Sequence, residues 1–319
     1  MKNSKSNKPP LDSHTREFLT HEKRLRGIAY RILGNLQEAE EVVQEVYLQS
    51  RNIDNNETID TLGALLTTLT VRRSLDLLKT AAKQREHYVG PWLPTPIVSQ
   101  WADTEASKIP QQSSEPHDDS ALQLEMSQNL STAFMLMLER LSPLERAVFV
   151  LRQGFDLNYQ EIAASVDQSA DYCRQLYRRA QNHIGHDKDR FETTEQQHHA
   201  IFNQFLAALA NADIAGIKNL LAEDAIAYSD GGGKAIAALR PIYGRDKVTR
   251  LFIGLNKNFA PTTSTRFYLI DGLPGIILYE GDTAVNTLSA HILEGEIKAF
   301  YVTRNPDKLQ HLSTKVQLL

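Results

Sequence analysis

The sequence predicts three folded parts in one chain, two all-α domains followed by an α+β domain. Three observations lead to this fold class. Hydrophobic residues recur at steps of three and four in two separate stretches, the period of helices with one buried face. An acidic stretch poor in apolar residues, 103–125, lies between them and indicates a linker. After residue 195, helical stretches give way to short aliphatic and aromatic runs. The predicted limits are 12–90 and 128–187 for the helical domains, 91–127 for the linker and 195–319 for the α+β domain.

Composition limits the functions open to this chain. Its 319 residues suffice for two or three domains with adequate cores. A net charge of −4 argues against a protein that coats nucleic acid without selectivity. Cys173 is the only cysteine, which excludes an intrachain disulfide. Without an 18-residue apolar run or an apolar leader, the sequence predicts a cytoplasmic protein with no membrane span.

The first predicted domain places an acidic helix beside a basic one. In Leu25 to Gln49, one helix ends at Gly34-Asn35 and a second begins, with small and branched apolar residues on its buried stripe. The next helix, Leu62 to Arg85, has an aliphatic face followed by arginines and lysines. Such a pair of helices predicts one protein partner and one nucleic-acid partner. The acidic face carries Glu38, Glu41, Gln44 and Glu45.

The second domain has the pattern of a helix-turn-helix. Ser142-Pro143-Leu144-Glu145 and Asn158 to Glu161 each predict a helix start with a capping box. Asp167-Gln168-Ser169 predicts the turn before a third helix. A solvated basic face on a bundle helix is the alternative, and duplex DNA in the major groove is the prediction. The third helix has a packed stripe of Cys173, Leu176, Tyr177, Ala180 and Ile184 and an outer face of Tyr172, Arg174, Gln175, Arg178 and Arg179.

The C-terminal part predicts helices on one face of a curved antiparallel sheet, an α+β cone. An amphipathic helix is expected over Glu195 to Ala212, a second through Ile217, Leu220 and Leu221, and a third from Arg245 to about Asn258. The predicted strands are Ala225 to Asp230, Thr265 to Asp271, Gly275 to Tyr279, Ala284 to Leu293 and Ile297 to Thr303.

Both helical patterns resemble the extracytoplasmic-function (ECF) sigma factors of bacterial RNA polymerase. EAEEVVQEVYL, from Glu38, resembles the family's region 2.2, and LSPLERAVFVLR with YQEIAASV and the arginine-rich helix resembles region 4. The resemblance implies a transcription initiation factor, not an enzyme, whose partners are the RNA polymerase core, promoter double-stranded DNA and the melted minus-10 strand. Many members carry a Trp near Leu65 or Leu66 and an Asn at Arg72, so the residue that captures a flipped base stays open.

The same resemblance implies three sets of contact residues. Glu38, Glu41, Gln44 and Glu45 would dock on the polymerase. The minus-10 element would be contacted by Arg72, Arg73, Asp76, Lys79, Lys83 and Arg85, and the minus-35 element by Ser169, Tyr172, Arg174, Gln175, Arg178 and Arg179. The acidic linker would run through the polymerase channel, and a plain tether is the alternative.

The tail resembles the SnoaL-like fold, shared with ketosteroid isomerase. Three motifs further resemble a sigma-factor subgroup with a fused SnoaL-like extension, which implies regulation in cis. The motifs are GPWLPTP, DGGGK and NPDKL. Their residues taken as regulatory are Trp92, Leu93, Pro94, Asp230, Gly231, Gly232, Gly233, Lys234, Asn305, Pro306, Asp307 and Lys308.

Alternatives remain for these motifs. The three glycines predict a tight turn or a close backbone approach, with an ordinary hairpin loop as the alternative. They do not form a Walker A loop, because Ala235 follows Lys234 where that motif has Ser or Thr. Trp92 would anchor in a groove of another domain or tuck onto its own domain.

The tail could also bind or transform a small molecule. A small apolar ligand or metabolite is a possible occupant of a retained pocket. Asp230, Tyr228, Asp271 and His291 could supply an enolizing base and its polar partners, although structural roles for such residues are commoner. His198-His199 has no further ligand cluster, so neither metal nor cofactor is predicted.

Three rival functions remain. The chain could be a stand-alone repressor with a ligand-sensing tail, a SnoaL-like enzyme with a DNA-binding anchor, or a structural scaffold. The acidic face at Glu38 to Glu45 favours the sigma factor, since a repressor would not need it.

Overall fold

The structure is a computed structural model that describes residues 12–52, 62–85, 87–99, 131–184, 195–256 and 263–313. The chain divides into two compact units. The first comprises Met1–Thr80 and Ser142–Ala180, and the second comprises Ala81–Leu141 and Gln181–Leu319. The second unit therefore contains the tail, the whole predicted linker, the end of the first predicted domain and residues 128–141 of the second.

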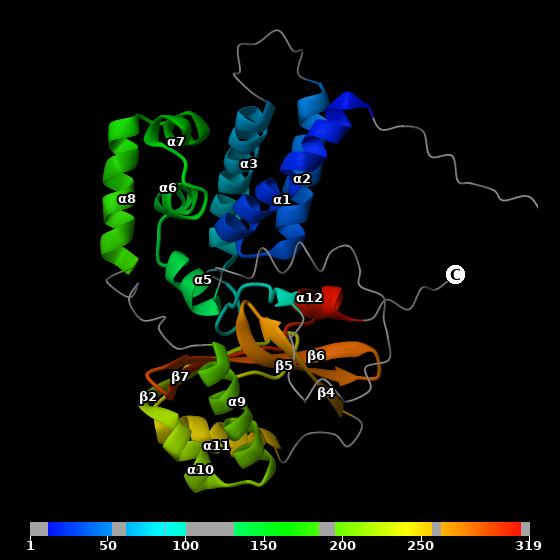
Figure 1. Cartoon of the computed structure of the whole chain (residues 1–319), viewed down its shortest axis with the longest axis vertical. Coiled ribbons are helices and arrows are strands. Elements are labelled where there is room, and N and C mark those ends of the chain that lie inside the picture. The colour runs from blue at the N-terminus through cyan, green and yellow to red at the C-terminus, as the bar shows by residue number, and fades with distance from the viewer. Residues whose placement is uncertain are drawn as a thin grey trace, which may run out of the picture. The chain divides into compact units, whose positions relative to one another are not determined.

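Three helices of the first unit correspond to the first predicted domain (Figure 1). The predicted break at Gly34-Asn35 is confirmed, because Gly34 ends one helix with a left-handed φ of 70° and Asn35 caps the next through its side chain. The branched residues of the acidic helix form its buried stripe. These helices are α1 (Ser13–Leu33), α2 (Leu36–Arg51) and α3 (Leu62–Arg85).

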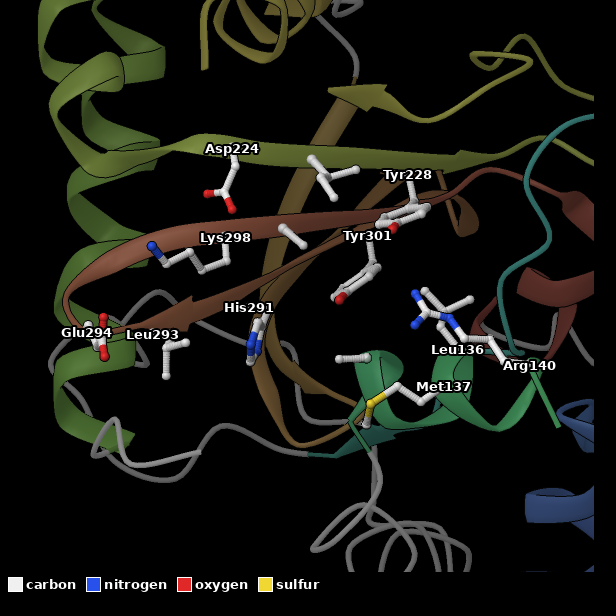
Figure 2. Close-up of a pocket in the computed structure, with 13 residues that line it drawn as sticks. Leu136, Met137, Arg140, Asp224, Tyr228, His291, Leu293, Glu294, Lys298 and Tyr301 are labelled. Atoms are coloured by element: carbon white, nitrogen blue, oxygen red, sulfur yellow. The ribbon is translucent and has the colours of Figure 1, made fainter. Parts of the chain in front are cut away.

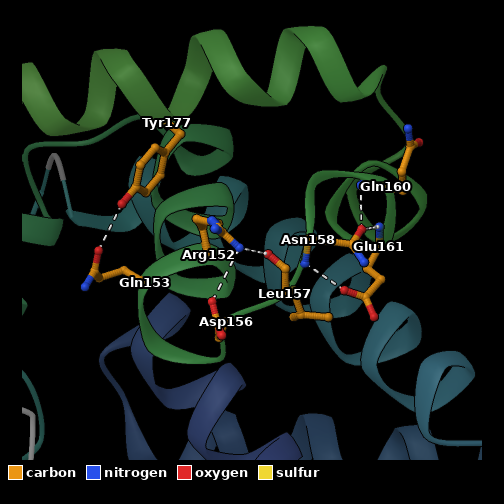
Figure 3. Close-up of polar contacts among 8 residues, drawn as sticks. All are labelled: Arg152, Gln153, Asp156, Leu157, Asn158, Gln160, Glu161 and Tyr177. Atoms are coloured by element: carbon orange, nitrogen blue, oxygen red, sulfur yellow. Dashed lines mark hydrogen bonds and ion pairs between the residues drawn. The ribbon is translucent and has the colours of Figure 1, made fainter.

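The helix-turn-helix has the local structure that its caps predict. Ser142 with Glu145 and Asn158 with Glu161 each form a complete capping box. Figure 3 shows the second box together with the Tyr177 hydroxyl, which donates to Gln153 over 2.9 Å. Cys173, Leu176, Ala180 and Ile184 are buried, and Tyr177 is half-buried, as the stripe predicts. The three helices are α6 (Pro143–Gly154), α7 (Tyr159–Val166) and α8 (Ala170–Ile184).

Within the first unit, α6 packs on α1. Arg146 is 2% exposed, and its Nε donates to the Arg31 carbonyl oxygen over 3.0 Å. The Arg31 guanidinium lies 4.9 Å from the centroid of the Phe155 ring. Burial lowers the pKa of Arg31 to about 10, so the side chain stays cationic at neutral pH.

The second unit is built on a seven-stranded sheet in the order β1-β4-β5-β6-β7-β2-β3. The prediction of a wholly antiparallel sheet is wrong at one pair, since β2 runs parallel to β7. The alternation of apolar and polar residues in the sequence indicates which residues share a face of the sheet. It does not indicate whether neighbouring strands run parallel or antiparallel. The strands are β1 (Val98–Ser99), β2 (Leu221–Asp230), β3 (Ile242–Tyr243), β4 (Thr263–Ile270), β5 (Leu273–Glu280), β6 (Thr283–Leu293) and β7 (Glu296–Thr303).

Helices cover one face of this sheet, as predicted (Figure 1). The space between them and the sheet is filled by the rings of Phe202, Phe205, Phe252 and Phe300. The second helix was predicted to include Leu221, but it ends at Leu220 because Leu221 is extended and pairs with β7. The helices are α9 (Glu195–Ala210), α10 (Ile214–Leu220) and α11 (Arg245–Asn256).

The opposite face is covered by segments from elsewhere in the chain. Residues 87–99, the end of the first predicted domain and the start of the predicted linker, lie on it, and the last two form β1 on the edge strand β4. The fully buried Leu93 packs against Tyr301 and Ala299 of β7. Two short helices complete this layer, α5 (Thr132–Leu138) and α12 (Pro306–Leu309), and the latter is followed by a 3-10 turn, η3 (Gln310–Leu312). The acidic stretch 103–125 lies outside the described residues.

Two kinds of feature are absent from the residues that the structure describes. None of the helices there combines the length and the apolar character that a bilayer crossing requires. Within those same ranges, no group of three or more His, Cys, Asp or Glu side chains could hold a metal ion.

Candidate functional site

The acidic face of α2 is open over most of its predicted residues. Glu41, Gln44 and Glu45 are exposed, and Glu38 is half-buried. Glu45 forms a bidentate ion pair with Arg73 of α3, and one of its bonds measures 3.0 Å from Nη2 to Oε1. A predicted polymerase contact and a predicted DNA contact are thus paired with each other.

The basic residues of α3 also have partners inside the first unit. Arg72 is exposed and donates from Nη2 to the carbonyl oxygen of Ala164 in α7, over 3.1 Å. Lys79 lies 3.4 Å from Asp76 on the surface. Lys83 and Arg85 belong to α3, but their side chains lie outside the described part of the chain. Arg72 is therefore held against the helix-turn-helix in this arrangement.

The outer face of α8 presents the predicted DNA contacts. Gln175, Arg178 and Arg179 are exposed and form no hydrogen bond with another described residue. Arg174 pairs with Asp171 and lies over the Tyr159 ring, 5.3 Å from its centroid. The Ser169 hydroxyl accepts from the amide of Tyr172, which is half-buried. Two arginines and one glutamine remain available for base edges or phosphates.

Asp230, at the end of β2, is the centre of a buried polar cluster in the second unit. This carboxylate is completely buried. It accepts hydrogen bonds from the Tyr88 hydroxyl over 2.6 Å and from the Leu93 amide over 2.9 Å. Its counter-ion is Lys308, whose Nζ lies 2.7 Å from Oδ2. We call this cluster the Asp230 site.

Lys308 joins all three regulatory motifs in one place. Its ammonium group pairs with Asp230, donates to the Leu93 carbonyl oxygen and lies 4.3 Å from the centroid of the Trp92 ring. Its side chain is only 7% exposed, so these contacts replace its hydration. Asn305 caps α12 and thereby fixes where Lys308 projects.

The glycines allow the backbone of the DGGGK turn to approach this cluster. Gly232 has a φ of 58°, and a Cβ there would lie 2.3 Å from Asn305 Nδ2. That amide nitrogen in turn donates to the Tyr88 hydroxyl over 2.8 Å. A Cβ on Gly231 would lie 2.3 Å from the Ala235 carbonyl oxygen. The glycines thus lie both in a tight turn, in which the Lys234 amide donates to the Gly231 carbonyl oxygen over 3.0 Å, and in close backbone contact with Asn305. Lys234 itself forms an exposed ion pair with Asp307.

A second buried carboxylate, Asp271, holds the linker further along. Its Oδ1 accepts from the Ile97 amide over 2.8 Å, and its Oδ2 lies 2.5 Å from the Thr132 hydroxyl oxygen. Its own amide donates to the Ile97 carbonyl oxygen over 2.7 Å. Burial raises the pKa of Asp271 to about 7, against the opposing effect of the hydrogen bonds from Thr132 and Ile97. We call this cluster the Asp271 site.

Several members of these sites could not be inferred from local sequence patterns. Tyr88, Thr132 and His311, whose Nε2 lies 2.9 Å from the Pro96 carbonyl oxygen, were not singled out. Their partners lie more than a hundred residues away, which no local pattern reports. Asp271 entered only as a possible catalytic base.

The four candidate catalytic residues do not form a catalytic constellation. Asp230 and Asp271 are both engaged in holding the linker. Tyr228 and His291 instead line a cavity on the same face of the sheet (Figure 2). A base and its polar partners would have to converge on one reacting atom.

Comparison with known proteins identifies the class. The family model for Sigma-70 region 2 matches residues 18–84, and that for Sigma-70, region 4 matches residues 131–184. The chain is 30% identical to the ECF RNA polymerase sigma factor SigJ of Mycobacterium tuberculosis over 303 residues, 92% of each chain. It is 28% identical to a probable ECF sigma factor, SigI, of the same species, over 93% of this chain and 94% of that one.

One solved structure agrees with this class. The crystal structure of M. tuberculosis SigJ matches with a TM-score of 0.71 at 28% identity, covering 93% of this chain and 98% of that one. The chain belongs to the ECF RNA polymerase sigma factors. It has two helical sigma domains and a C-terminal SnoaL-like α+β domain, and it is a transcription initiation factor, not an enzyme.

Proposed function

We propose that this sigma factor directs promoter-specific initiation through three surfaces. The acidic face of α2 docks on the polymerase core, α3 contacts the minus-10 element, and α8 enters the major groove at minus-35. The exposed face of α8 carries the DNA part of the proposal, since Gln175, Arg178 and Arg179 are exposed beside a packed apolar stripe. Membership of the family supports both partners.

The proposed promoter contacts require rearrangement within the first unit. Arg72 is engaged with Ala164 of α7, and Arg73 with Glu45 of α2. Arg72 cannot contact a DNA duplex through Nη2 while that atom donates to the Ala164 carbonyl oxygen. The polymerase would thus release α3 when it binds Glu45 and the rest of the acidic face.

Regulation in cis is the second part of the proposal. The observation that carries it is the buried Asp230–Lys308 pair, which holds Tyr88, Trp92 and Leu93 on the tail. These residues follow α3, so their release would lengthen the free connection between regions 2 and 4. The tail would act through this length, in place of a separate inhibitory protein.

Transcription with purified core polymerase tests the first part. We expect initiation at the factor's own promoters to depend on the added protein. Glu41→Lys should weaken core binding by about tenfold or more, because it reverses an exposed charge at the proposed contact. Glu17→Lys, which reverses another exposed charge, on α1, is the control. If the factor binds promoter DNA without polymerase, and Glu41→Lys matches the control, a stand-alone repressor is the better assignment.

Arg178→Ala tests the minus-35 contact separately. With polymerase present, we expect promoter binding to weaken by about 1–3 kcal/mol when the minus-35 element is intact, if Arg178 reads a base edge. The measurement compares that promoter with one whose minus-35 element is scrambled. Arg16→Ala, an exposed arginine on α1, should leave both unchanged. An equal loss of binding free energy on the two promoters would mean that Arg178 contacts a phosphate and not a base edge.

A further inference from the structure

A cavity of about 410 Å³ lies between α5 and the sheet face opposite α9 to α11. That volume is within the range of small-molecule sites. Side chains along β2, β6 and β7 alternate between the two faces of the sheet. Those on one face line the cavity, and those on the other belong to the core under the helices. The phenylalanine-filled side of the sheet is therefore separate from this cavity.

One end of the cavity combines flat apolar walls with a cation. The Tyr228 and Tyr301 rings stack with centroids 5.7 Å apart and planes within 18°. Leu136 and Met137 of α5 line the cavity with them. Figure 2 shows the Arg140 side chain beside this tyrosine pair. The Arg140 guanidinium is exposed and forms no hydrogen bond or ion pair with another described residue.

The other end has the opposite character. Asp224 and Glu294 are exposed there, and Lys298 is 2.9 Å from Glu296, which leaves it partly neutralised. Figure 2 shows Asp224, Lys298 and Glu294 grouped away from Arg140. A ligand with a single negative charge would place that charge at Arg140. A second negative charge at the far end of the same ligand would be repelled by the carboxylates of Asp224 and Glu294.

We propose that this cavity binds a planar, ring-containing monoanion such as an aromatic carboxylate. The ring lies against the Tyr228–Tyr301 pair, and the carboxylate pairs with Arg140. Because α5 forms one wall, the bound ligand also holds α5 on the sheet, next to Thr132 of the Asp271 site. The proposal stands independently of the transcriptional one.

Fluorescence titration of the full chain with 1-anilinonaphthalene-8-sulfonate tests it. We expect one saturable site per chain, from which 1-naphthoate displaces the dye at a concentration at least tenfold lower than the neutral 1-naphthalenemethanol does. Arg140→Glu should weaken dye binding at least tenfold. Arg240→Glu, a matched reversal at an exposed arginine of the same unit, should have no effect.

Two results would overturn the proposal. One is equal displacement by the naphthoate and the alcohol, which requires no variant and so does not depend on variant folding. The other is dye binding by Arg140→Glu that equals that of the parent chain. Met137→Trp, which fills the cavity without altering charge, should also abolish binding, and its helix content by circular dichroism reports whether it folds.

Discussion

Asp230→Asn is expected to destabilise the second unit by about 3–5 kcal/mol, because it leaves Lys308 as a buried charge without its partner. The carboxylate is fully buried, and the lysine side chain is 7% exposed, so water cannot replace the lost ion pair. The asparagine oxygen can still accept a hydrogen bond from either the Tyr88 hydroxyl or the Leu93 amide. The other of these two hydrogen bonds, and the ion pair with Lys308, would be lost.

Denaturant unfolding of the full chain measures this loss, with tryptophan fluorescence as a report on the linker. The chain has two tryptophans, so a Trp101→Phe background leaves Trp92 as the reporter. Asp282→Asn is the control, because this carboxylate is exposed in the turn after β5 and should contribute little to stability. Asp230→Asn combined with Lys308→Met should recover part of the loss, since both charges are then gone.

Transcription by the same variants separates a structural from a regulatory role. If the Asp230 site regulates in cis, Asp230→Asn and Asp282→Asn should differ in transcription while α6 to α8 stay folded. Equal transcription from both variants and the parent chain, with the linker shown to be released, would contradict regulation through this site.

Local signals in the sequence were sufficient for the helical part of the fold. Capping boxes at Ser142 and Asn158 depend on residues three apart, and the stripe of α8 repeats every three or four residues. The exposed faces of α2 and α8 follow from the same periodicity. What each face binds came from the resemblance, because periodicity reports burial and not partners.

The linker contacts could not be predicted in this way. A two-residue strand such as β1 has no periodicity, and it exists because the edge of β4 offers Ile270 and Leu269 as pairing partners. The Tyr88–Asp230 and Thr132–Asp271 bonds span 142 and 139 residues. The three motifs near these sites were recognised as a set, but their convergence on Lys308 is a property of the folded sheet.

The two buried carboxylates differ in what balances their charge. Asp230 has the Lys308 ammonium group, whereas Asp271 has an amide and a hydroxyl. Burial consequently raises the pKa of Asp271 from 3.8 to about 7. In the protonated state the Oδ2 hydroxyl can donate to Thr132 while Oδ1 still accepts from Ile97. The Asp271 site is thus compatible with a neutral carboxyl group.

Stability should therefore fall as the pH rises from about 4 to about 7, by up to about 4 kcal/mol from this group alone. Between these values the folded chain retains a proton that the unfolded chain has released. Because the folded state binds more protons, each unit rise in pH lowers the free energy of unfolding. The contribution is fully present below the unfolded pKa of 3.8 and is lost above the folded pKa of about 7.

Asp271→Asn isolates this contribution. Asparagine can accept from the Ile97 amide and donate to the Thr132 hydroxyl without titrating, so the variant should gain stability over the parent chain as the pH rises. The quantity to compare is the difference in unfolding free energy between the two proteins from pH 4 to pH 8. The effect of histidine titration on stability is common to both proteins and cancels in this difference. Asp282→Asn, an exposed change in the turn after β5, should show no such trend. A constant difference for Asp271→Asn across this range would mean that the Asp271 site holds the linker with the carboxylate charged throughout.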